Sequence, residues 1–503
     1  VLDLARILAG PSATMLMGDM GAEIIKVERP KVGDDTRRYA PPYIQKRKGE
    51  DSDIAAYFTS CNRNKQSIAL NFTKPEGQEI IKHLLAESDV LIENFKTGTL
   101  DKYGLGYEQL KEQFPQLIYC SITGFGHTGP YKERPAYDML IQAMGGSMSI
   151  TGVPDGEPMK MGLSMFDLTA GLHGVIGILA ALQDRHATGL GQHVDISMLD
   201  VSVALLQNQG MNYLAKKERQ KRVGNNHPNV VPYQVMPSKN GHFILTASND
   251  EQFEKFCKVA GRMDLVADDR FNTMKARVVN RPVVTPALNE VTKTQTTGWW
   301  LEQLEKAGVG CAPILHPDEV FADPHVLSRG MLIEMEVPGC EEPASFIGSP
   351  MKFSRTKVNY RLPPPRLGAH TERVLLDNGY ASEELETLRE KGILDFEPRA
   401  PGDQELEPVV TAREVRASRR QQQAAVPGAV SWGRLHSVSE PNFDGYEVPA
   451  PAYKQPESDV RGRFVSGAAW SQFGDEFAAQ SAAAPFECGS DHRQNEGWAE
   501  IFA

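Results

Sequence analysis

The residue of this chain best placed to do chemistry is Asp167, a single carboxylate in a stretch that is otherwise uncharged. It precedes residues 168–182, a run rich in glycine and alanine that is apolar nearly all round and therefore predicts a buried helix. An aspartate there can cap the helix, because its oxygens accept hydrogen bonds from the free amides of the first turn. It can also be a nucleophile, held in an apolar pocket at the positive end of the helix. Spacing alone favours the cap, and both interpretations stay open at this point.

A second candidate is the glycine-rich segment 124–129, Gly-Phe-Gly-His-Thr-Gly, which follows a predicted strand. A dinucleotide-binding loop of this form opens an apolar helix and has an acidic residue about twenty positions further on. Here Pro130 and the charged residues 132–134 come next, and the acidic residue is missing. The segment therefore argues against a nicotinamide cofactor, and it suits either a close backbone approach to a substrate or a mobile turn.

Four basic residues follow predicted strands or turns on the loop-rich side of the expected sheet: Arg29, Arg63, Lys65 and Lys102. Each alone is typical of a solvated surface charge, but together they could hold an anionic nucleotide where α/β folds bind ligands. The histidines and the six cysteines show no metal-ligand spacing, so we expect no metal site. No serine lies in a Gly-x-Ser-x-Gly segment, which disfavours a serine hydrolase.

Composition narrows the class of protein. The 503 residues, 41% hydrophobic and 24% charged, suit two or three globular domains, and the net charge of −11 argues against nucleic-acid or anionic-membrane surfaces. No run approaches 18 consecutive apolar residues, so we expect no membrane span. Scattered cysteines suit an intracellular protein. The chain opens at Val1 without an initiator methionine, so cytoplasm and mitochondrial matrix stay equally open.

The positioning elements alternate between strand and helix. Strands are predicted at 1–4, 23–27, 66–71, 89–93, 117–122 and 192–198, and helices at 13–20, 75–86, 107–113, 137–144 and 167–182. This alternation predicts an α/β fold with an open, doubly wound parallel sheet. A smaller α+β part is predicted at about 231–311, with a strand at 242–246 and a helix at 251–260, and a further strand at 331–338. Residues 396–503 have few aliphatic residues and no periodicity, which predicts a disordered tail.

Several motifs, in order along residues 1–395, resemble the class III coenzyme A transferases. They are Leu8-Ala9-Gly10-Pro11, residues 21–30 (GAEIIKVERP), residues 62–68 (NRNKQSI), Glu93-Asn94-Phe95, residues 134–138 (RPAYD), residues 142–146 (QAMGG) and residues 367–371 (LGAHT). In that family the nucleophile is an aspartate just before a long Gly/Ala-rich helix, so the resemblance implies catalysis by Asp167, with Tyr137 and Asp138 beside it. It further implies coenzyme A binding by Ile7, Leu8, Arg29, Asn94, Phe95, Thr99 and Lys102.

The resemblance implies an activity and an assembly as well. Coenzyme A would pass from an acyl-CoA, with succinyl-CoA the expected donor, to a carboxylic acid such as glutarate, through aspartyl anhydride and aspartyl-CoA intermediates and without a permanently bound cofactor. Leu8 stands where formyl-CoA transferase has glutamine, which argues against formyl or oxalyl substrates. The alternatives are an α-methylacyl-CoA racemase, although Tyr137 occupies the place of its histidine, and a non-enzymatic acyl-CoA-binding protein with a recruiting tail.

The layout expected from the family is a Rossmann-like large domain built from both chain ends. Residues 1–205 would form its N-terminal part, 206–312 a small α+β domain with its connections, 313–395 the return segment, and 396–503 the tail. Two subunits would interlock as a homodimer, and residues 224–229 stand where the family has a glycine-rich flap.

Overall fold

The computed structural model describes residues 1–396, so the predicted tail lies outside the described residues, apart from residue 396. Its largest element is a seven-stranded sheet with the strand order β14-β5-β2-β1-β6-β7-β8. Every neighbouring pair is parallel except β14 with β5. The strands are β1 (Leu2–Asp3), β2 (Ile24–Glu28), β5 (Lys65–Leu70), β6 (Val90–Glu93), β7 (Ile118–Thr123), β8 (His193–Ser197) and β14 (Leu394–Asp395). The predicted parallel sheet is confirmed, with one antiparallel strand added at its edge.

The strand order reverses at β1. Strands β2 and β5 follow on one side of it, whereas β6, β7 and β8 follow on the other. In doubly wound sheets of this kind, ligands bind at the carboxyl ends of the two strands where the order reverses. These strands are β1 and β6, so the loops at residues 4–8 and 94–99 are the expected place for a ligand.

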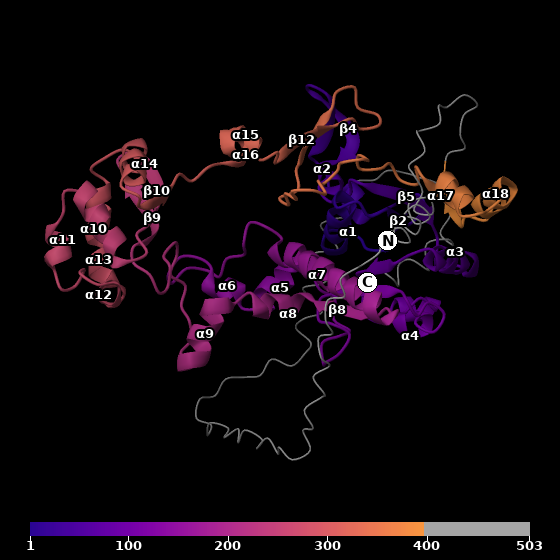
Figure 1. The fold of residues 1–503 in the computed structure, drawn as a ribbon, viewed down its shortest axis with the longest axis horizontal. Coiled ribbons are helices and arrows are strands. Elements are labelled where there is room, and N and C mark those ends of the chain that lie inside the picture. The colour runs from indigo at the N-terminus through magenta and orange to yellow at the C-terminus, as the bar shows by residue number, and fades with distance from the viewer. Residues whose placement is uncertain (397–503) are drawn as a thin grey trace, which may run out of the picture. The chain divides into compact units, whose positions relative to one another are not determined.

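Helices cover both faces of the sheet, because alternate residues of a buried strand point to opposite sides. Ile92 belongs to the core under α1 (Ala9–Asp19) and α7 (Met165–Thr188). Leu91 belongs to the core under α3 (Pro75–Ala86). Two late helices, α17 (Thr371–Asp377) and α18 (Ser382–Glu390), complete the second core, and Figure 1 shows them beside β5.

Helix α7 is long and apolar enough to cross a membrane by length and composition alone. Within the described residues it is a core helix, since it packs on α1, α8, β7 and β8. Gly171 permits the close approach of α1: a Cβ atom there would lie 2.6 Å from the Ala9 carbonyl oxygen and 2.7 Å from Ser12 Oγ.

Shorter elements connect the strands of the large sheet. They are the 3-10 helices η1 (Asp35–Arg38) and η2 (Leu100–Tyr103), the hairpin of β3 (Tyr43–Arg47) and β4 (Glu50–Ala55), and the helices α2 (Ala56–Thr59), α4 (Tyr107–Leu110), α5 (Asp138–Met144), α6 (Ser147–Ile150) and α8 (Met198–Ala204).

A separate antiparallel sheet of three strands has its own apolar core, which includes Trp300, Phe243 and Phe256. Its strands are β9 (Tyr233–Ser238), β10 (Gly241–Thr246) and β11 (Gly310–Ala312). The accompanying helices are α10 (Asp250–Val259), α11 (Asp264–Ala267), α12 (Met274–Val279), α13 (Arg281–Thr292) and α14 (Thr297–Lys306). Helix α9 (Gln207–Lys216) precedes them in the chain and contacts α8. The domain boundaries at 205, 312 and 395 stay predictions.

The chain then returns to the large sheet. The elements of this segment are α15 (Pro317–Ala322), α16 (Pro324–Ser328), β12 (Leu332–Met335) and β13 (Ala344–Ile347). Met335 and Phe346 of the β12–β13 hairpin share a small core with Ile54 of β4. Strand β14 ends the described chain, pairing Leu394 with Leu70 of β5.

Three predicted helix bounds were wrong. Helix α1 begins at Ala9 rather than near residue 13, because Pro11 falls in the first turn, where a missing N–H removes no helical hydrogen bond. Helix α4 ends at Leu110 rather than about 113. Helix α7 runs from Met165 to Thr188 rather than from 167 to 182, and Gly189 ends it in the left-handed conformation.

Candidate functional site

Asp167 is the third residue of α7 and does not cap it, so the capping interpretation is wrong. The N-cap residue is Ser164, whose side chain makes no capping hydrogen bond. The first turn is capped instead by Asp138 of α5: its Oδ2 accepts hydrogen bonds from the backbone N–H groups of Phe166 (2.7 Å) and Asp167 (3.2 Å). A carboxylate is favoured there by the free amides and by the helix dipole. The Asp167 carboxylate is therefore not needed to terminate its own helix.

The environment of Asp167 disfavours its charged form. The residue is half-buried, and burial, followed by the charge of Asp138, raises the pKa of its carboxyl to about 7. Desolvation and a like charge act in the same direction on an acid. Among residues 1–396, no hydrogen bond reaches the Asp167 carboxylate oxygens. A poorly solvated carboxylate without hydrogen-bond donors is a stronger nucleophile than one in water, so the site suits covalent catalysis.

Two tyrosines that the sequence did not single out lie near this carboxylate. Burial of Tyr57 of α2, together with the charge of Asp167, raises the pKa of its hydroxyl to about 12. Tyr39 packs edge-on against Tyr57, with ring centroids 5.4 Å apart. Tyr57 is thus a protonated hydroxyl donor beside the nucleophile. No local pattern marks it, because residues 55–59 are an ordinary apolar stretch.

Tyr137 immediately precedes the capping residue Asp138 and is 61% exposed. Its hydroxyl and that of Tyr39 are close enough to affect the titration of Arg6 electrostatically. Arg6 is paired with Asp35 at 2.5 Å. The predicted neighbours of Asp167 therefore meet as one group, in which Asp138 holds the helix start and Tyr137 faces outward.

The loops at the ends of β1 and β6 are joined directly, as the strand order requires. The side-chain amide of Asn94 accepts a hydrogen bond from Arg6 N–H (2.9 Å) and donates one to the Arg6 carbonyl (2.8 Å). Ile7 and Leu8 follow, and Leu8 is the N-cap residue of α1. The backbone of this crossing is rigidly bound, and it leads into the helix that contacts α7 one turn beyond Asp167.

The predicted coenzyme A set is only partly brought together. Arg29 lies at the end of β2, where burial lowers the pKa of its guanidinium and Asp35 opposes that shift. Lys102 is exposed on η2, and Thr99 is the buried residue preceding that helix. Phe95 is buried in the apolar core and contacts Phe72 edge-on, so its backbone rather than its ring is available to a ligand.

Two basic residues of the expected anion cluster are used elsewhere. Arg63 forms a buried pair with Asp19 (2.6 Å), and Lys65 forms one with Asp3 (3.1 Å). All four side chains are at most 3% exposed. The expectation that Arg63 and Lys65 hold an anionic nucleotide is therefore wrong. Moving either side chain away from its partner to bind a ligand would leave a buried charge unpaired, which strongly destabilises a fold.

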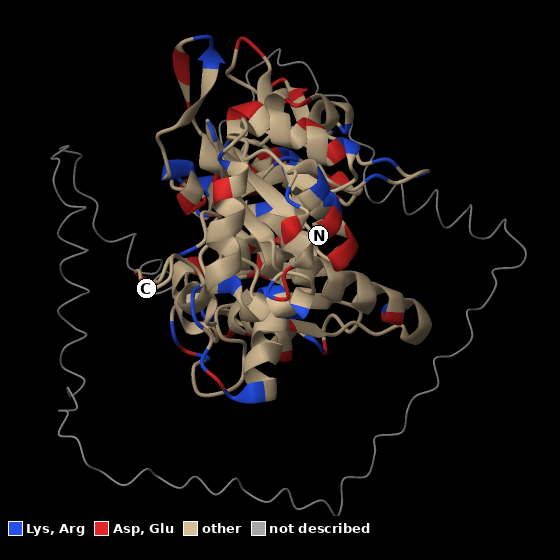
Figure 2. Cartoon of the chain, turned by 90° about the vertical axis from the view of Figure 1, so that its left-hand side faces the viewer, with Lys and Arg blue, Asp and Glu red and all other residues tan. Residues whose placement is uncertain are grey.

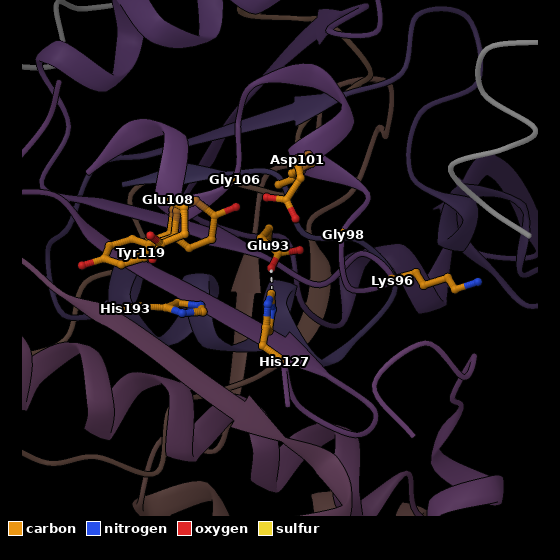
Figure 3. A pocket seen from close by; sticks show the side chains of 11 residues that line it. Glu93, Lys96, Gly98, Asp101, Gly106, Glu108, Tyr119, His127 and His193 are labelled. Atoms are coloured by element: carbon orange, nitrogen blue, oxygen red, sulfur yellow. Dashed lines mark ion pairs between the residues drawn. The ribbon is translucent and has the colours of Figure 1, made fainter. Parts of the chain in front are cut away.

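A cavity of about 200 Å³ opens beside the loop that carries Thr99 and Lys102, on the sheet face opposite α7. Glu93 lies at its floor; burial raises the pKa of this carboxyl to about 7 despite hydrogen bonds from Ser121 and from Phe95 N–H. Figure 3 shows Glu93 and His127 pointing toward each other, 3.9 Å apart, with Lys96 directed away. The cavity is lined by three carboxylates (Glu93, Asp101 and Glu108) but by only one lysine, Lys96, which points away from it, so it is a poor place for phosphates.

The two histidines of this cavity lie in contact with each other. Their rings pack edge-on at 4.9 Å, and burial lowers the pKa of His193. Within residues 1–396, no group of three or more histidine, cysteine, aspartate or glutamate side chains is arranged to hold a metal ion.

The chain was compared with known proteins. The model of CoA-transferase family III matches residues 1–371. The chain belongs to this family. It is 43% identical over 398 residues to the succinate–glutarate CoA-transferase of Agrobacterium fabrum, covering 77% of this chain and 95% of that protein. It is 41% identical over 396 residues to the succinyl-CoA:glutarate CoA-transferase of Homo sapiens, covering 78% and 89%.

A solved structure agrees. The CAIB/BAIF family protein from Brucella suis superposes with a TM-score of 0.66 at 47% identity, covering 75% of this chain and 97% of that one. The resemblance found in the sequence is thus confirmed, and the chain is an enzyme of the CoA-transferase class. As such it uses coenzyme A thioesters as substrates.

Proposed function

We propose that this CoA-transferase moves coenzyme A from succinyl-CoA to a dicarboxylate such as glutarate, with Asp167 as the covalent nucleophile. The observation that carries the proposal is the half-buried Asp167 carboxylate, which receives no hydrogen bond from residues 1–396. Because Asp138 caps the start of α7, Asp167 is not needed for that role. The choice of substrates is supported by the names of the relatives from Agrobacterium fabrum and Homo sapiens.

The first half of the reaction releases succinate. The Asp167 carboxylate attacks the thioester carbonyl of succinyl-CoA, and the coenzyme A thiolate leaves, which gives a mixed anhydride. The thiolate then attacks the aspartyl carbonyl of the anhydride and expels succinate, leaving an aspartyl-CoA thioester. Each intermediate is about as activated as the starting thioester, so the transfer splits into small steps.

The second half runs in reverse with the acceptor. Glutarate attacks the aspartyl carbonyl and expels the thiolate, which then attacks the glutaryl carbonyl of the new anhydride. Glutaryl-CoA leaves and the Asp167 carboxylate is regenerated. In this proposal, backbone N–H groups at the start of α1 and the hydroxyl of Tyr57 stabilise the tetrahedral oxyanions.

The remaining parts of the family pattern belong to the same proposal. Arg29 and Lys102 bind the nucleotide part of coenzyme A, with Ile7, Leu8, Asn94 and Thr99 shaping the channel and the backbone of Phe95 contributing. Two copies of the chain form a homodimer, and residues 224–229 stand where the family has its glycine-rich flap. No tightly bound cofactor or metal ion takes part.

Replacement of Asp167 tests the function. Asp167→Asn keeps the shape of the side chain but removes the nucleophile, so transfer from succinyl-CoA to glutarate should fall by several orders of magnitude. Incubation of the wild type with succinyl-CoA followed by hydroxylamine should leave a hydroxamate at Asp167, detectable by peptide mass spectrometry.

Three outcomes would contradict the proposal. Substantial turnover by Asp167→Asn would remove the covalent mechanism. Transfer to other acids but not to glutarate would remove the acceptor. Incorporation of solvent deuterium at the α-carbon, without transfer, would indicate a racemase instead.

A further inference from the structure

Side chains hold the backbone of residues 5–7, in the loop between β1 and α1. All six backbone polar groups of residues 5–7 are bound in this way, mostly by buried residues from other elements. The contacts are Ala5 N–H to Asp3 Oδ1 (2.9 Å), Ala5 C=O from Lys26 Nζ (2.8 Å), Arg6 N–H and C=O to the Asn94 amide (2.9 and 2.8 Å), Ile7 N–H to both Asp34 oxygens (3.2 Å each) and Ile7 C=O from Cys61 Sγ (3.5 Å). An ordinary surface loop leaves most of these groups to water.

The backbone conformation that these contacts impose on Ile7 is unfavourable by itself. Ile7 has φ of 68°, in the left-handed region that a β-branched residue rarely adopts. Such backbone strain persists only where the surroundings over-determine it, and it gathers at functional sites. The contact that acts directly on Ile7 is the carboxylate of Asp34, whose two oxygens are both within 3.2 Å of its N–H.

Among the side chains that bind residues 5–7, Lys26 and Asp34 form a buried ion pair. Their side chains are 1% and 0% exposed and are joined at 2.9 Å. Asp34 also accepts hydrogen bonds from the N–H and the hydroxyl of Thr36, and burial is outweighed by these contacts, so the pKa of Asp34 stays below its usual value. A buried pair contributes little net stability compared with apolar residues of the same size. Its retention here therefore suggests a geometric role.

The loop leads directly into the helix that crosses α7 beside the proposed nucleophile. Leu8 is the N-cap residue of α1, so the first amides of that helix follow Ile7 directly. Helix α1 meets α7 at the Ala9–Gly171 approach, one turn beyond Asp167. A rotation at Ile7 would change the direction of these N–H groups relative to the start of α7.

We propose that Lys26 and Asp34 are positioning residues, which hold Ile7 left-handed and so aim the first amides of α1 at the acyl group on Asp167. The inference rests on the proposed function, in which those amides stabilise the oxyanion. Neither residue touches the substrate. They act on the transition state through the backbone, so their loss should lower kcat and leave substrate binding nearly unchanged.

The double variant Lys26→Met/Asp34→Asn tests this without leaving a lone buried charge. We expect kcat to fall about 10- to 100-fold, whereas KM for succinyl-CoA changes less than about threefold. The matched control is Arg63→Met/Asp19→Asn, which neutralises an equally buried pair at the far end of α1. Its kcat should stay within about threefold of wild type, with both variants assayed well below their unfolding temperatures.

A rescue experiment separates positioning from general damage. Glycine adopts φ of 68° without strain, so adding Ile7→Gly to the Lys26/Asp34 variant should restore kcat at least about fivefold. If the Lys26/Asp34 variant loses kcat because its fold is generally damaged, removing the Ile7 side chain would not restore kcat.

The inference is overturned if the Lys26/Asp34 variant keeps kcat within about threefold of wild type, if the control pair loses as much, or if Ile7→Gly gives no rescue. Asp167→Asn in the same assay keeps the two proposals distinct. An active Asp167→Asn overturns the covalent mechanism, whereas an inactive one beside an undamaged Lys26/Asp34 variant overturns the positioning role alone.

Discussion

At the scale of single residues, two aspartates divide the work at the start of α7. Asp138 supplies the cap from another helix, so the carboxylate of Asp167, the third residue of α7, is not used for capping and can serve as the proposed nucleophile. The arrangement has a cost, because the charged form of Asp167 is desolvated and lies near a second carboxylate. Active sites commonly hold groups of this kind at the expense of stability.

The first prediction follows from that cost. The pKa of Asp167 in the fold is about 7, above the ordinary value of 3.8, so the folded protein keeps a proton between these pH values that the unfolded chain has released. Stability is therefore lost as the pH rises through this window. Asp167→Asn cannot ionise and should raise the thermal midpoint by a few degrees at pH 8 and by less at pH 5.

Thermal unfolding followed by circular dichroism at both pH values measures this effect. The exposed Asp155 provides the control, since Asp155→Asn should shift the midpoint equally little at either pH. An Asp167→Asn protein that is no more stable than wild type at pH 8 would show that the carboxylate is not destabilised.

At the scale of elements, the site depends on how closely α1 and α7 cross. Gly171 lets the carbonyl of Ala9 and the hydroxyl of Ser12 approach to distances that a methyl group would block. Neither neighbour can move freely, because one is helix backbone and the other is hydrogen-bonded to the Ala9 carbonyl. The crossing brings the first turn of α1, with amides that have no partner inside the helix, against the second turn of α7.

Gly171→Ala should accordingly destabilise the protein by about 1–3 kcal/mol, although alanine is the better helix former. Urea unfolding measures the loss, and kcat should fall with it as α1 moves away from Asp167. Gly298 in α14 is the control, because a Cβ atom there meets nothing within 4 Å and Gly298→Ala should not destabilise. Equal stability of the two variants would argue against a tight crossing.

At the scale of the whole molecule, α7 presents an apolar stripe that the described residues leave uncovered. Leu168, Leu172, Ile176 and Leu179 recur at helical spacing, and Ile176 is 63% exposed. Charged residues do not gather there, and Figure 2 shows basic and acidic residues interspersed over the visible elements rather than separated into two faces. A contiguous apolar surface of this kind is typical of an interface between subunits, which supports the proposed homodimer.

Ile176→Asp should break that homodimer, since a charge would be buried without a partner. Light scattering after size exclusion should give a dimer for the wild type and a monomer or an aggregate for the variant. Val279→Asp, at an exposed position in α12, is the control and should stay dimeric. An Ile176→Asp protein that remains a dimer would place the interface elsewhere.

Much of the fold could be predicted because its signals are local. Strand patterns such as 89–93 and 117–122 are legible in windows of about ten residues. Asp167 stood out for the same reason, as a lone charge before a Gly/Ala-rich helix. The errors were also local in origin: Pro11 indicated a turn, although a first helical turn accepts it.

By itself the sequence determined the parallel sheet, the family and the identity of the candidate nucleophile. Only the tertiary structure decided what surrounds that nucleophile. Asp138, 29 residues away, caps its helix, and Tyr57 reaches it from a connecting segment. Asn94 binds the backbone of Arg6 across 88 residues. The same reason applies to Arg63 and Lys65, whose side chains are as basic in sequence as Arg29 but are buried against Asp19 and Asp3. Periodicity and spacing report the nearest turns of the chain, whereas burial and charge pairing depend on which distant residues packing brings into contact.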